Sequence, residues 1–335
     1  MPRFGRQPWS ISATRSRHSP GLFNSGRTTS LILKISLLLI HVVIVGFLFL
    51  FDEQLIRKTR SEPWYTAIYL ALFAATLVQY FYTSCSTPGY VLDAMTAYND
   101  THHAFLSISK SSEKSAPSLV QSSISSMDGR PSWKNKSGTL TTAWVKQLMD
   151  LYPSGTSTRS WICAYCQTLR PPRAHHCADC DKCILKFDHH CIWLGTCIGQ
   201  GNHCRFWWYI FEETVLCIWT AILYICFFRA IVEREWWQNG IAIILSAILL
   251  LCLIFLLSIL IFHCYLILTN QTSYELIRRH RIPYLREIPE WEHPFSKGIC
   301  RNLYDFCCSR NSLCAMEPVP TRDDQEERSH ITYVN

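Results

Sequence analysis

Four long apolar runs dominate the pattern of hydrophobic and polar positions along the chain. They cover residues 31–51, 64–83, 206–228 and 240 to about 269. A helix rises about 1.5 Å per residue, so about 20 apolar residues cross the ~30 Å hydrocarbon core of a bilayer. Each run is long enough for this, and we therefore expect an all-α polytopic membrane protein with four transmembrane helices.

The first apolar run follows a basic segment and could imitate a secretory signal peptide. No small-residue cleavage site follows it, because the chain continues with Asp52 and Glu53. We therefore expect this run to remain as a membrane helix. The second run opens with Trp64 and Tyr65, aromatic residues typical of the membrane–water interface.

The positive charges indicate how the chain is oriented in the membrane. An even number of spans places both termini and the long loop between the second and third spans on one side. Of the 32 Lys and Arg residues, 26 lie in these three segments, one is Lys34, and five lie in the two short loops. By the positive-inside rule, the termini and the long loop are expected to face the cytosol. Cytosolic thiols are kept reduced, so a cysteine cluster there is more often metal-bound than disulfide-bonded.

The composition between the runs divides the chain into segments. Residues from about 96 to 160 are rich in Ser and Lys and lack apolar periodicity, which is typical of a flexible linker. The expected organisation is a cytosolic N-terminal segment (1–30), transmembrane helices 1 and 2 (31–83), a flexible cytosolic linker (84–160), a cysteine-rich zinc domain (161–205), transmembrane helices 3 and 4 (206–269) and a cytosolic tail (270–335).

Composition and charge argue against other broad classes. The chain has 335 residues, of which 49% are hydrophobic, and its mean hydropathy is slightly positive. Together with apolar runs of about 20 residues, this argues against an ordinary soluble domain. The formal net charge of +7 is not gathered into one stripe with interleaved aromatic residues. A nucleic-acid partner is therefore not expected.

A dense group of possible metal ligands lies in the long loop. Seven of the 17 cysteines and four histidines fall between Cys163 and Cys197. The repeated Cys-x2-Cys spacing lets two thiolates on a tight turn bind one tetrahedral Zn²⁺. Apolar residues are sparse between Cys163 and Cys183, so bound metal would supply much of the folding free energy. The pattern predicts a structural zinc domain.

The candidate ligands outnumber what two zinc ions need. Two closed tetrahedral sites take eight of the eleven candidates, so up to three remain. The surplus is expected among His189, His190 and Cys191, which follow Asp188. A thiol beside an imidazole, itself beside a carboxylate, is typical of an activated thiolate nucleophile. Spacing does not decide which histidine serves which purpose, and the alternative is that all four residues are structural ligands or their hydrogen-bonding partners.

The sequence Asp188-His189-His190-Cys191 and the spacing before it resemble the signature domain of the DHHC family of protein S-acyltransferases, also called palmitoyltransferases. The resemblance covers roughly residues 161–206. It implies that Cys191 is the acylated nucleophile, His189 its general base and Asp188 the residue that orients His189. It also implies two zinc sites, one of Cys163, Cys166, His176 and Cys183 and one of Cys177, Cys180, His190 and Cys197.

The resemblance further implies the reaction and its partners. A long-chain fatty acyl group, palmitoyl above all, would pass from acyl-CoA to Cys191 and then to a cysteine of a membrane-associated protein. Its chain would lie in an apolar cavity between the spans. Arg173, Lys182 and Arg205 could attract the CoA phosphates, although positive-inside bias explains them equally well. The sequence around the motif is most similar to that of a plant branch of the family, whose members act at Golgi and vacuolar membranes.

The family's weaker motifs are partly present. Asn202 matches an Asn that leads into the third span, and Gly298 with Asn302 resembles a C-terminal aromatic motif. Residues 87–89 are Thr-Pro-Gly where the family often has Asp-Pro-Gly. Residues 272–275 are Thr-Ser-Tyr-Glu where it has Thr-Thr-x-Glu. Both changes keep the turn or the hydroxyl group, so we expect activity to be retained.

Two other functional classes share part of the pattern. A membrane-anchored RING-like ubiquitin ligase also has interleaved zinc sites, but it would close with a further Cys-x2-Cys pair, and none lies between Cys183 and the third span. A four-span transporter with a zinc-sensing loop would need polar residues at mid-depth in more than one span. The spans are too apolar to favour it.

Two glutamates and two histidines nevertheless lie within the spans. Glu212 and Glu213 are expected to be interfacial or ion-paired, with a functional role as the alternative. His41 and His263 are expected to be hydrogen-bonded packing residues, with a proton relay as the alternative.

Overall fold

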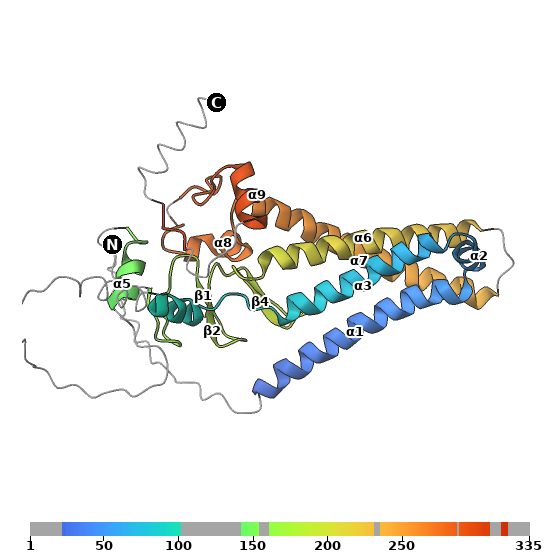
Figure 1. Ribbon diagram of the computed structural model, residues 1–335, viewed down its shortest axis with the longest axis horizontal. Coiled ribbons are helices and arrows are strands. Elements are labelled where there is room, and N and C mark those ends of the chain that lie inside the picture. The colour runs from blue at the N-terminus through green and yellow to red at the C-terminus, as the bar shows by residue number, and fades with distance from the viewer. Residues whose placement is uncertain are drawn as a thin grey trace, which may run out of the picture.

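Four long helices run lengthwise through the molecule and carry a small cysteine-rich domain at one end (Figure 1). The structure, a computed structural model, describes residues 22–101, 142–153, 161–230, 235–286, 288–308 and 316–320. In this part of the chain, four helices are long and apolar enough to cross a membrane. The prediction of four transmembrane helices is therefore confirmed. They are α1 (Leu22–Phe51), α3 (Pro63–Cys85), α6 (His203–Arg229) and α7 (Trp236–Leu268).

The helices extend beyond the predicted apolar runs, because a helix satisfies its own backbone hydrogen bonds whether lipid or water surrounds it. α1 begins at Leu22 instead of residue 31, and α7 begins at Trp236 instead of residue 240. A short helix that the sequence analysis missed, α2 (Glu53–Ser61), joins α1 to α3. The Asp52 carboxylate caps it by accepting hydrogen bonds of 3.0 and 3.2 Å from the N–H groups two and three residues later.

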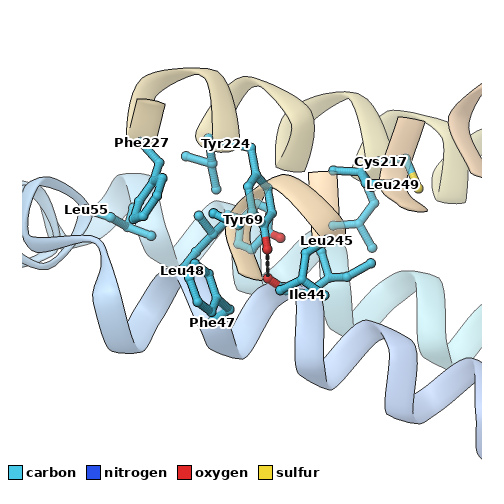
Figure 2. Packing of buried hydrophobic residues seen from close by; sticks show 13 residues of the cluster. Ile44, Phe47, Leu48, Leu55, Tyr69, Cys217, Tyr224, Phe227, Leu245 and Leu249 are labelled. Carbon is cyan, nitrogen blue, oxygen red and sulfur yellow. Dashed lines mark hydrogen bonds between the residues drawn. The ribbon is translucent and has the colours of Figure 1, made fainter. Parts of the chain in front are cut away.

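A cluster of large buried side chains closes the end of the bundle remote from the cysteine-rich domain (Figure 2). The Phe47 ring of α1 contacts Tyr224 and Phe227 of α6, with ring centroids 6.4 and 5.8 Å apart. The Tyr224 hydroxyl donates to the Ile44 carbonyl at 2.9 Å. Lipid offers no partner for such a hydroxyl, so the interhelical bond stabilises the packing of α1 against α6.

Two parts of the predicted flexible linker are helical. Residues 91–101 form one helix, and α5 (Thr142–Met149) forms another. Both pack on the cysteine-rich domain through fully buried side chains, among them Met95, Trp144 and Leu148. An amphipathic pattern over so few residues cannot be told from irregular structure, which is why these helices were missed. Residues 102–141, the middle of the linker, lie outside the described residues, as do residues 1–21 and 321–335.

The cysteine-rich domain is built on two antiparallel hairpins of three-residue strands. β1 (His175–Cys177) pairs with β2 (Lys182–Ile184), and β3 (His189–Cys191) pairs with β4 (Thr196–Ile198). Strands this short carry no alternation that a sequence pattern could reveal. Apart from two isolated β-bridges, the rest of the described secondary structure is helical. The predicted fold class, a helical membrane protein with a cysteine-rich domain between spans two and three, therefore holds.

The chain after α7 returns to the cysteine-rich domain. α8 (Ser273–Arg278), the 3-10 helix η2 (Arg279–Arg281) and α9 (Ile299–Cys307) lie at the same end of the bundle as the strands (Figure 1). In the C-terminal segment 316–320, the Val319 N–H donates to the Leu151 carbonyl at 2.8 Å. This segment therefore connects the tail to the residues that follow α5.

Arg173 is the centre of a buried charge network that joins these segments. Its guanidinium donates to both carboxylate oxygens of Glu275 at 2.7 Å. It also donates to the side-chain and main-chain oxygens of Asn270, at 3.1 and 2.8 Å, and to the carboxylate of Glu317. A buried cation with these partners is not available to CoA phosphates, so the structure removes Arg173 from that predicted role.

Replacing Glu317 with Ala is expected to lower the free energy of unfolding by about 1–3 kcal/mol, because the buried Arg173 loses a charged hydrogen-bond partner. Thermal unfolding of the purified chain measures the effect. Glu290→Ala is the matched control, since Glu290 pairs with His280 where both side chains are 75% exposed, and exposed pairs contribute little. Equal melting temperatures for the two variants would contradict the role given to Glu317.

Candidate active site and zinc-binding groups

Side chains alternate in direction along each strand, so the two neighbouring histidines of a strand lie on opposite faces. In the first hairpin His176 lies directly opposite Cys183, and in the second His190 lies directly opposite Cys197. Successive side chains of a strand point to opposite faces, so residues directly across a hairpin share a face. Each hairpin therefore presents one cysteine and one histidine together, whereas His175 lies on the other face of β1.

Each of these pairs meets two cysteines of a tight Cys-x2-Cys turn. The residue after each turn, Gln167 in one and Asp181 in the other, has a positive φ, of 52° and 49°. The same sharp local conformation therefore serves both turns. In each group four ligand atoms lie within 4.8 Å of one another. The groups are Cys163, Cys166, His176 and Cys183, and Cys177, Cys180, His190 and Cys197.

The distances within the groups suit zinc and do not suit disulfide bonds. His176 Nδ1 lies 3.3 Å from Cys166 Sγ. Cys180 Sγ lies 3.3 Å from Cys197 Sγ and 3.5 Å from His190 Nδ1. Two ligands bound to a tetrahedral Zn²⁺ at about 2.0–2.3 Å lie roughly 3.3–3.8 Å apart, whereas the sulfurs of a disulfide are about 2.05 Å apart. Both groups are thus compatible with closed zinc sites.

The face of β3 opposite the zinc-ligand candidate His190 carries His189 and Cys191, because these two residues are two positions apart. His189 Nδ1 lies 2.6 Å from Asp188 Oδ2. An ionised carboxylate only accepts hydrogen bonds, so Nδ1 carries the proton and Nε2 remains for the thiol of Cys191. This order of residues separates the zinc-ligand candidate His190 from the predicted catalytic pair along one three-residue strand.

The surroundings of Asp188 and His189 stabilise their charged forms. Burial alone would raise the pKa of the Asp188 carboxyl, but the nearby His203 and the hydrogen bond from His189 hold that pKa well below its usual range. Burial alone would lower the pKa of His189, but hydrogen bonds to Asp188 and to the thiol of Cys191 raise it to about 9.

Asp188 is itself held by the chain that follows α7. The Ser273 N–H donates to Asp188 Oδ1 at 2.7 Å, and the Ser273 hydroxyl donates to the Asp188 carbonyl at 2.9 Å. Thr272 caps α8 in a capping box with Glu275, which also binds Arg173. The Thr-Ser-Tyr-Glu sequence thus holds the Asp188 carboxylate in place, a role that the sequence motif alone did not reveal.

Asn202 and a glycine connect the second hairpin to the spans. Asn202 Nδ2 donates to the Cys197 carbonyl at 2.9 Å, and its Oδ1 accepts from the Gly199 N–H at 3.0 Å. Gly201 lies against the Thr-Pro-Gly turn, where an added Cβ would be 2.6 Å from the Thr87 carbonyl oxygen. The hydrogen bonds of Asn202 and the close packing of Gly201 on the Thr-Pro-Gly turn therefore keep the zinc-ligand candidate Cys197 in place against the start of α6.

A cavity of about 550 Å³ extends from Cys191 into the membrane part of the molecule. His189 and Trp193 line it beside Cys191. Figure 1 shows α1 diverging from α3 toward this end of the bundle. The volume lies within the range of about 300–1,000 Å³ that is common for ligand pockets. The walls are mostly apolar side chains of α1, α6 and α7, including Leu37, Ile44, Ile210, Leu216, Leu249 and Phe255.

The ionisable residues of the spans are placed in different ways. His41 Nε2 lies 2.7 Å from Glu213 Oε1, and both residues line the cavity. The structure therefore shows the predicted ion pair for Glu213 and the predicted hydrogen-bonded position for His41. Glu212 Oε2 is buried without a hydrogen-bond partner among the described residues. His263 Nδ1 lies 3.4 Å from Nε2 of His203.

Comparisons with known proteins identify relatives of the whole chain and of its central part. A family model described as DHHC palmitoyltransferase matches residues 156–280. Protein S-acyltransferase 10 of Arabidopsis thaliana is 49% identical over 324 residues, which cover 96% of this chain and 94% of the relative. Palmitoyltransferase ZDHHC12 of Homo sapiens is 37% identical over 150 residues, which cover 44% of this chain and 55% of the relative. Protein S-acyltransferase 8 of Arabidopsis thaliana is 29% identical over 173 residues, which cover 50% of this chain and 41% of the relative.

The longest of these matches spans the membrane helices as well as the cysteine-rich domain. The family-model match contains both groups of metal-ligand candidates, the Asp188–His189 pair, Cys191 and Ser273. This chain therefore belongs to the DHHC palmitoyltransferase family, the membrane-bound protein S-acyltransferases that attach fatty acyl groups to protein cysteines.

Proposed function

We propose that the chain transfers a long-chain fatty acyl group, palmitoyl above all, from acyl-CoA through a thioester on Cys191 to cysteines of membrane-associated proteins. The observation that carries this proposal is the position of His189 and Cys191. They share one face of β3 and line an apolar cavity, and Asp188 holds His189. A nucleophile, its base and a lipid-sized cavity thus meet at one place.

In the first step, His189 Nε2 takes the proton of the Cys191 thiol, and the thiolate attacks the thioester carbonyl of acyl-CoA. A new carbon–sulfur bond forms to Cys191 and the bond to the CoA sulfur breaks. The His189 imidazolium returns its proton to the departing CoA thiolate. In the second step, a substrate cysteine loses its proton to His189 and takes the acyl group, and Cys191 leaves as a thiol. One thioester replaces another, so the enzyme mainly activates and positions the thiol.

The cavity supports the choice of a fatty acyl substrate. Each buried methylene contributes about 0.8 kcal/mol, so an apolar pocket between the spans can hold a long chain while its thioester end meets Cys191. Lys182 and Arg205 remain as candidates for the CoA phosphates. Both now lie over tyrosine rings, with the Lys182 nitrogen 4.2 Å from the Tyr90 centroid and the Arg205 guanidinium carbon 4.7 Å from that of Tyr82.

Two structural Zn²⁺ ions are part of the proposal. The eight cysteine and histidine ligands named above would hold them, and the ions would stabilise a domain with little apolar core of its own. In this assignment His190 is a ligand and His189 is the base, and Cys191 binds no metal. His175 is left outside both groups, and its ring packs on that of Tyr274 at a centroid distance of 4.2 Å.

The proposal places both termini in the cytosol and the protein in a Golgi or vacuolar membrane. The bias of Lys and Arg toward the termini and the long loop supports the orientation. The resemblance to a plant branch of the family supports the compartment. Protease protection of tags on both termini in sealed membrane vesicles tests the orientation, and protection of either tag from external protease would overturn it.

Asp188→Asn is expected to slow self-acylation by about 10²–10⁴-fold, because the isosteric amide no longer fixes the protonated Nδ1 of His189 or stabilises its cation. The zinc content should not change, since Asp188 belongs to neither ligand group. Single-turnover transfer from labelled palmitoyl-CoA and metal analysis on one preparation measure both quantities. Asp150→Asn, at an exposed position after α5, is the control. If Asp188→Asn loses zinc or acylates at the wild-type rate, the orienting role is wrong.

A further inference from the structure

A third group of metal-ligand side chains lies behind the catalytic pair. It consists of Asp188, His203 at the start of α6 and His263 in α7, and their ligand atoms lie within 4.8 Å of one another. All three are buried, with exposed fractions of 1%, 7% and 4%. None of the three belongs to the two cysteine-containing groups. Three separate segments of the fold thus bring one carboxylate and two imidazoles together away from bulk water.

The geometry of this group suits a transition-metal ion. His203 Nε2 and His263 Nδ1 lie 3.4 Å apart, close to the ~3.3 Å that separates two imidazole nitrogens bound to one tetrahedral Zn²⁺. One carboxylate and two histidines with an open fourth position is a donor set that zinc uses in proteins. Asp188 already accepts bonds from His189 and Ser273, but a carboxylate has about four lone-pair sites and can accept more.

We propose that Asp188, His203 and His263 bind a third divalent transition-metal ion, with zinc as the preferred ion, and that this ion inhibits the acyltransferase. The inhibition rests on the proposed roles of Asp188 and His189, whereas the binding site does not. His263 and His189 both line the cavity, which gives the ion a path to the group. The third site differs from the two cysteine-containing groups in its ligands and in its chemistry.

Inhibition follows from the contacts of Asp188. Its carboxylate holds His189 Nδ1 through a hydrogen bond of 2.6 Å. A metal ion bound to the same carboxylate competes with His189 for its oxygens and changes the orientation of the carboxylate. His189 is then no longer held beside Cys191, so self-acylation slows. The two structural zinc groups contain neither Asp188 nor His189, and they are not expected to have this effect.

Metal content tests the site without reference to activity. The purified full chain is first equilibrated with a chelator too weak to remove thiolate-bound zinc, and then with micromolar Zn²⁺. Wild type is expected to rise from two to three zinc ions per chain. His203→Gln and His263→Gln should each remain at two. His280→Gln, which changes an exposed histidine with a 75% exposed side chain, should reach three like wild type.

Activity tests the proposed inhibition on the same preparations. Micromolar Zn²⁺ is expected to slow wild-type self-acylation by about 5- to 100-fold, a usual range for coupling between sites. The weak chelator should restore the rate, and within each histidine variant the ratio of rates with and without zinc should be near one. The retained pair of zinc ions shows that a variant is folded. If a variant does not fold, titration of wild type with Co²⁺ tests the third site instead. A third ion bound without sulfur adds visible absorption but no thiolate-to-cobalt band, and this result would support the site.

Each outcome separates the two ideas. A wild-type content that stays at two ions would overturn the third site and leave an ordinary hydrogen bond between His203 and His263. A third ion without any effect on the rate would overturn the inhibition. A third ion in a chain that never acylates Cys191 would leave the site standing and remove the proposed function instead.

Discussion

Cys191→Ser is expected to keep the two proposed structural zinc ions and the fold while losing the acyl-enzyme. The substitution removes a sulfur that belongs to neither metal group, so no ion should be released. A serine hydroxyl ionises far less readily than a thiol, and one neighbouring histidine does not compensate for the difference. Loss of the nucleophile in other acyl-transfer enzymes lowers kcat by on the order of 10⁶-fold, so no label should be detected.

The measurement for this variant is paired. Zinc content and transfer of a fatty chain from labelled acyl-CoA are determined on the same preparations of wild type and Cys191→Ser. Cys85→Ser, an exposed cysteine at the end of α3, is the matched control and should behave like wild type. Release of about one zinc ion from Cys191→Ser, or label retained on it, would remove Cys191 from the catalytic role.

Cys163→Ala and Cys180→Ala should each lose metal and the folded cysteine-rich domain together. Structural zinc contributes about 10–16 kcal/mol of apparent binding free energy, and in small metal domains this is folding free energy. The cores beside the two metal groups contain the ligand candidates Cys163, Cys177, Cys183 and Cys197 themselves. Each of these cysteines therefore contributes to the stability of the domain both as a ligand candidate and as a packed side chain.

Metal analysis, with limited proteolysis of the long loop, measures this second effect. Cys300→Ala, an exposed cysteine in α9, is the control and should retain two zinc ions and wild-type resistance to protease. A folded, active Cys163→Ala protein with unchanged zinc would show that Cys163 is not a ligand. Loss of activity with full zinc content and an intact domain would contradict the structural role of the metal.

The membrane part of the fold could be predicted because a bilayer sets one length and one composition for every span. The apolar runs give the number and order of the helices, although not their ends, since α1 and α7 continue through polar residues. The small helices were missed because no general rule of length or composition identifies them in the sequence. α2 and α5 are stabilised by contacts such as the buried Trp144 and the Asp52 cap, and these depend on the fold around them.

The cysteine and histidine spacing alone could predict zinc and a reactive thiol, but not the division of roles between His189 and His190. That division depends on the pairing of β3 with β4, which places His190 across from Cys197. A three-residue strand has no pattern that reveals its register. The family resemblance supplied the assignment, and the alternation of side chains provides a physical reason for it.

The contacts that hold the proposed catalytic residues could not be predicted from local sequence. Ser273 holds Asp188 across 85 positions of the chain, and Arg173 binds Glu275 across 102 positions and Glu317 across 144. Sequence analysis identified the Thr-Ser-Tyr-Glu segment only as a variant of a family motif. It placed Arg173 among candidates for phosphate binding because charge is visible in a sequence, whereas burial and partners are not.

The most direct test of the account is to locate the acyl group on the wild-type chain. Purified protein is incubated with palmitoyl-CoA without a protein substrate, digested, and examined by peptide mass spectrometry before and after hydroxylamine. The account predicts one predominant hydroxylamine-sensitive acyl group, on the peptide that contains Cys191. An unmodified Cys191 together with acylation of Cys204 or of the tail cysteines Cys300 and Cys307 would contradict it.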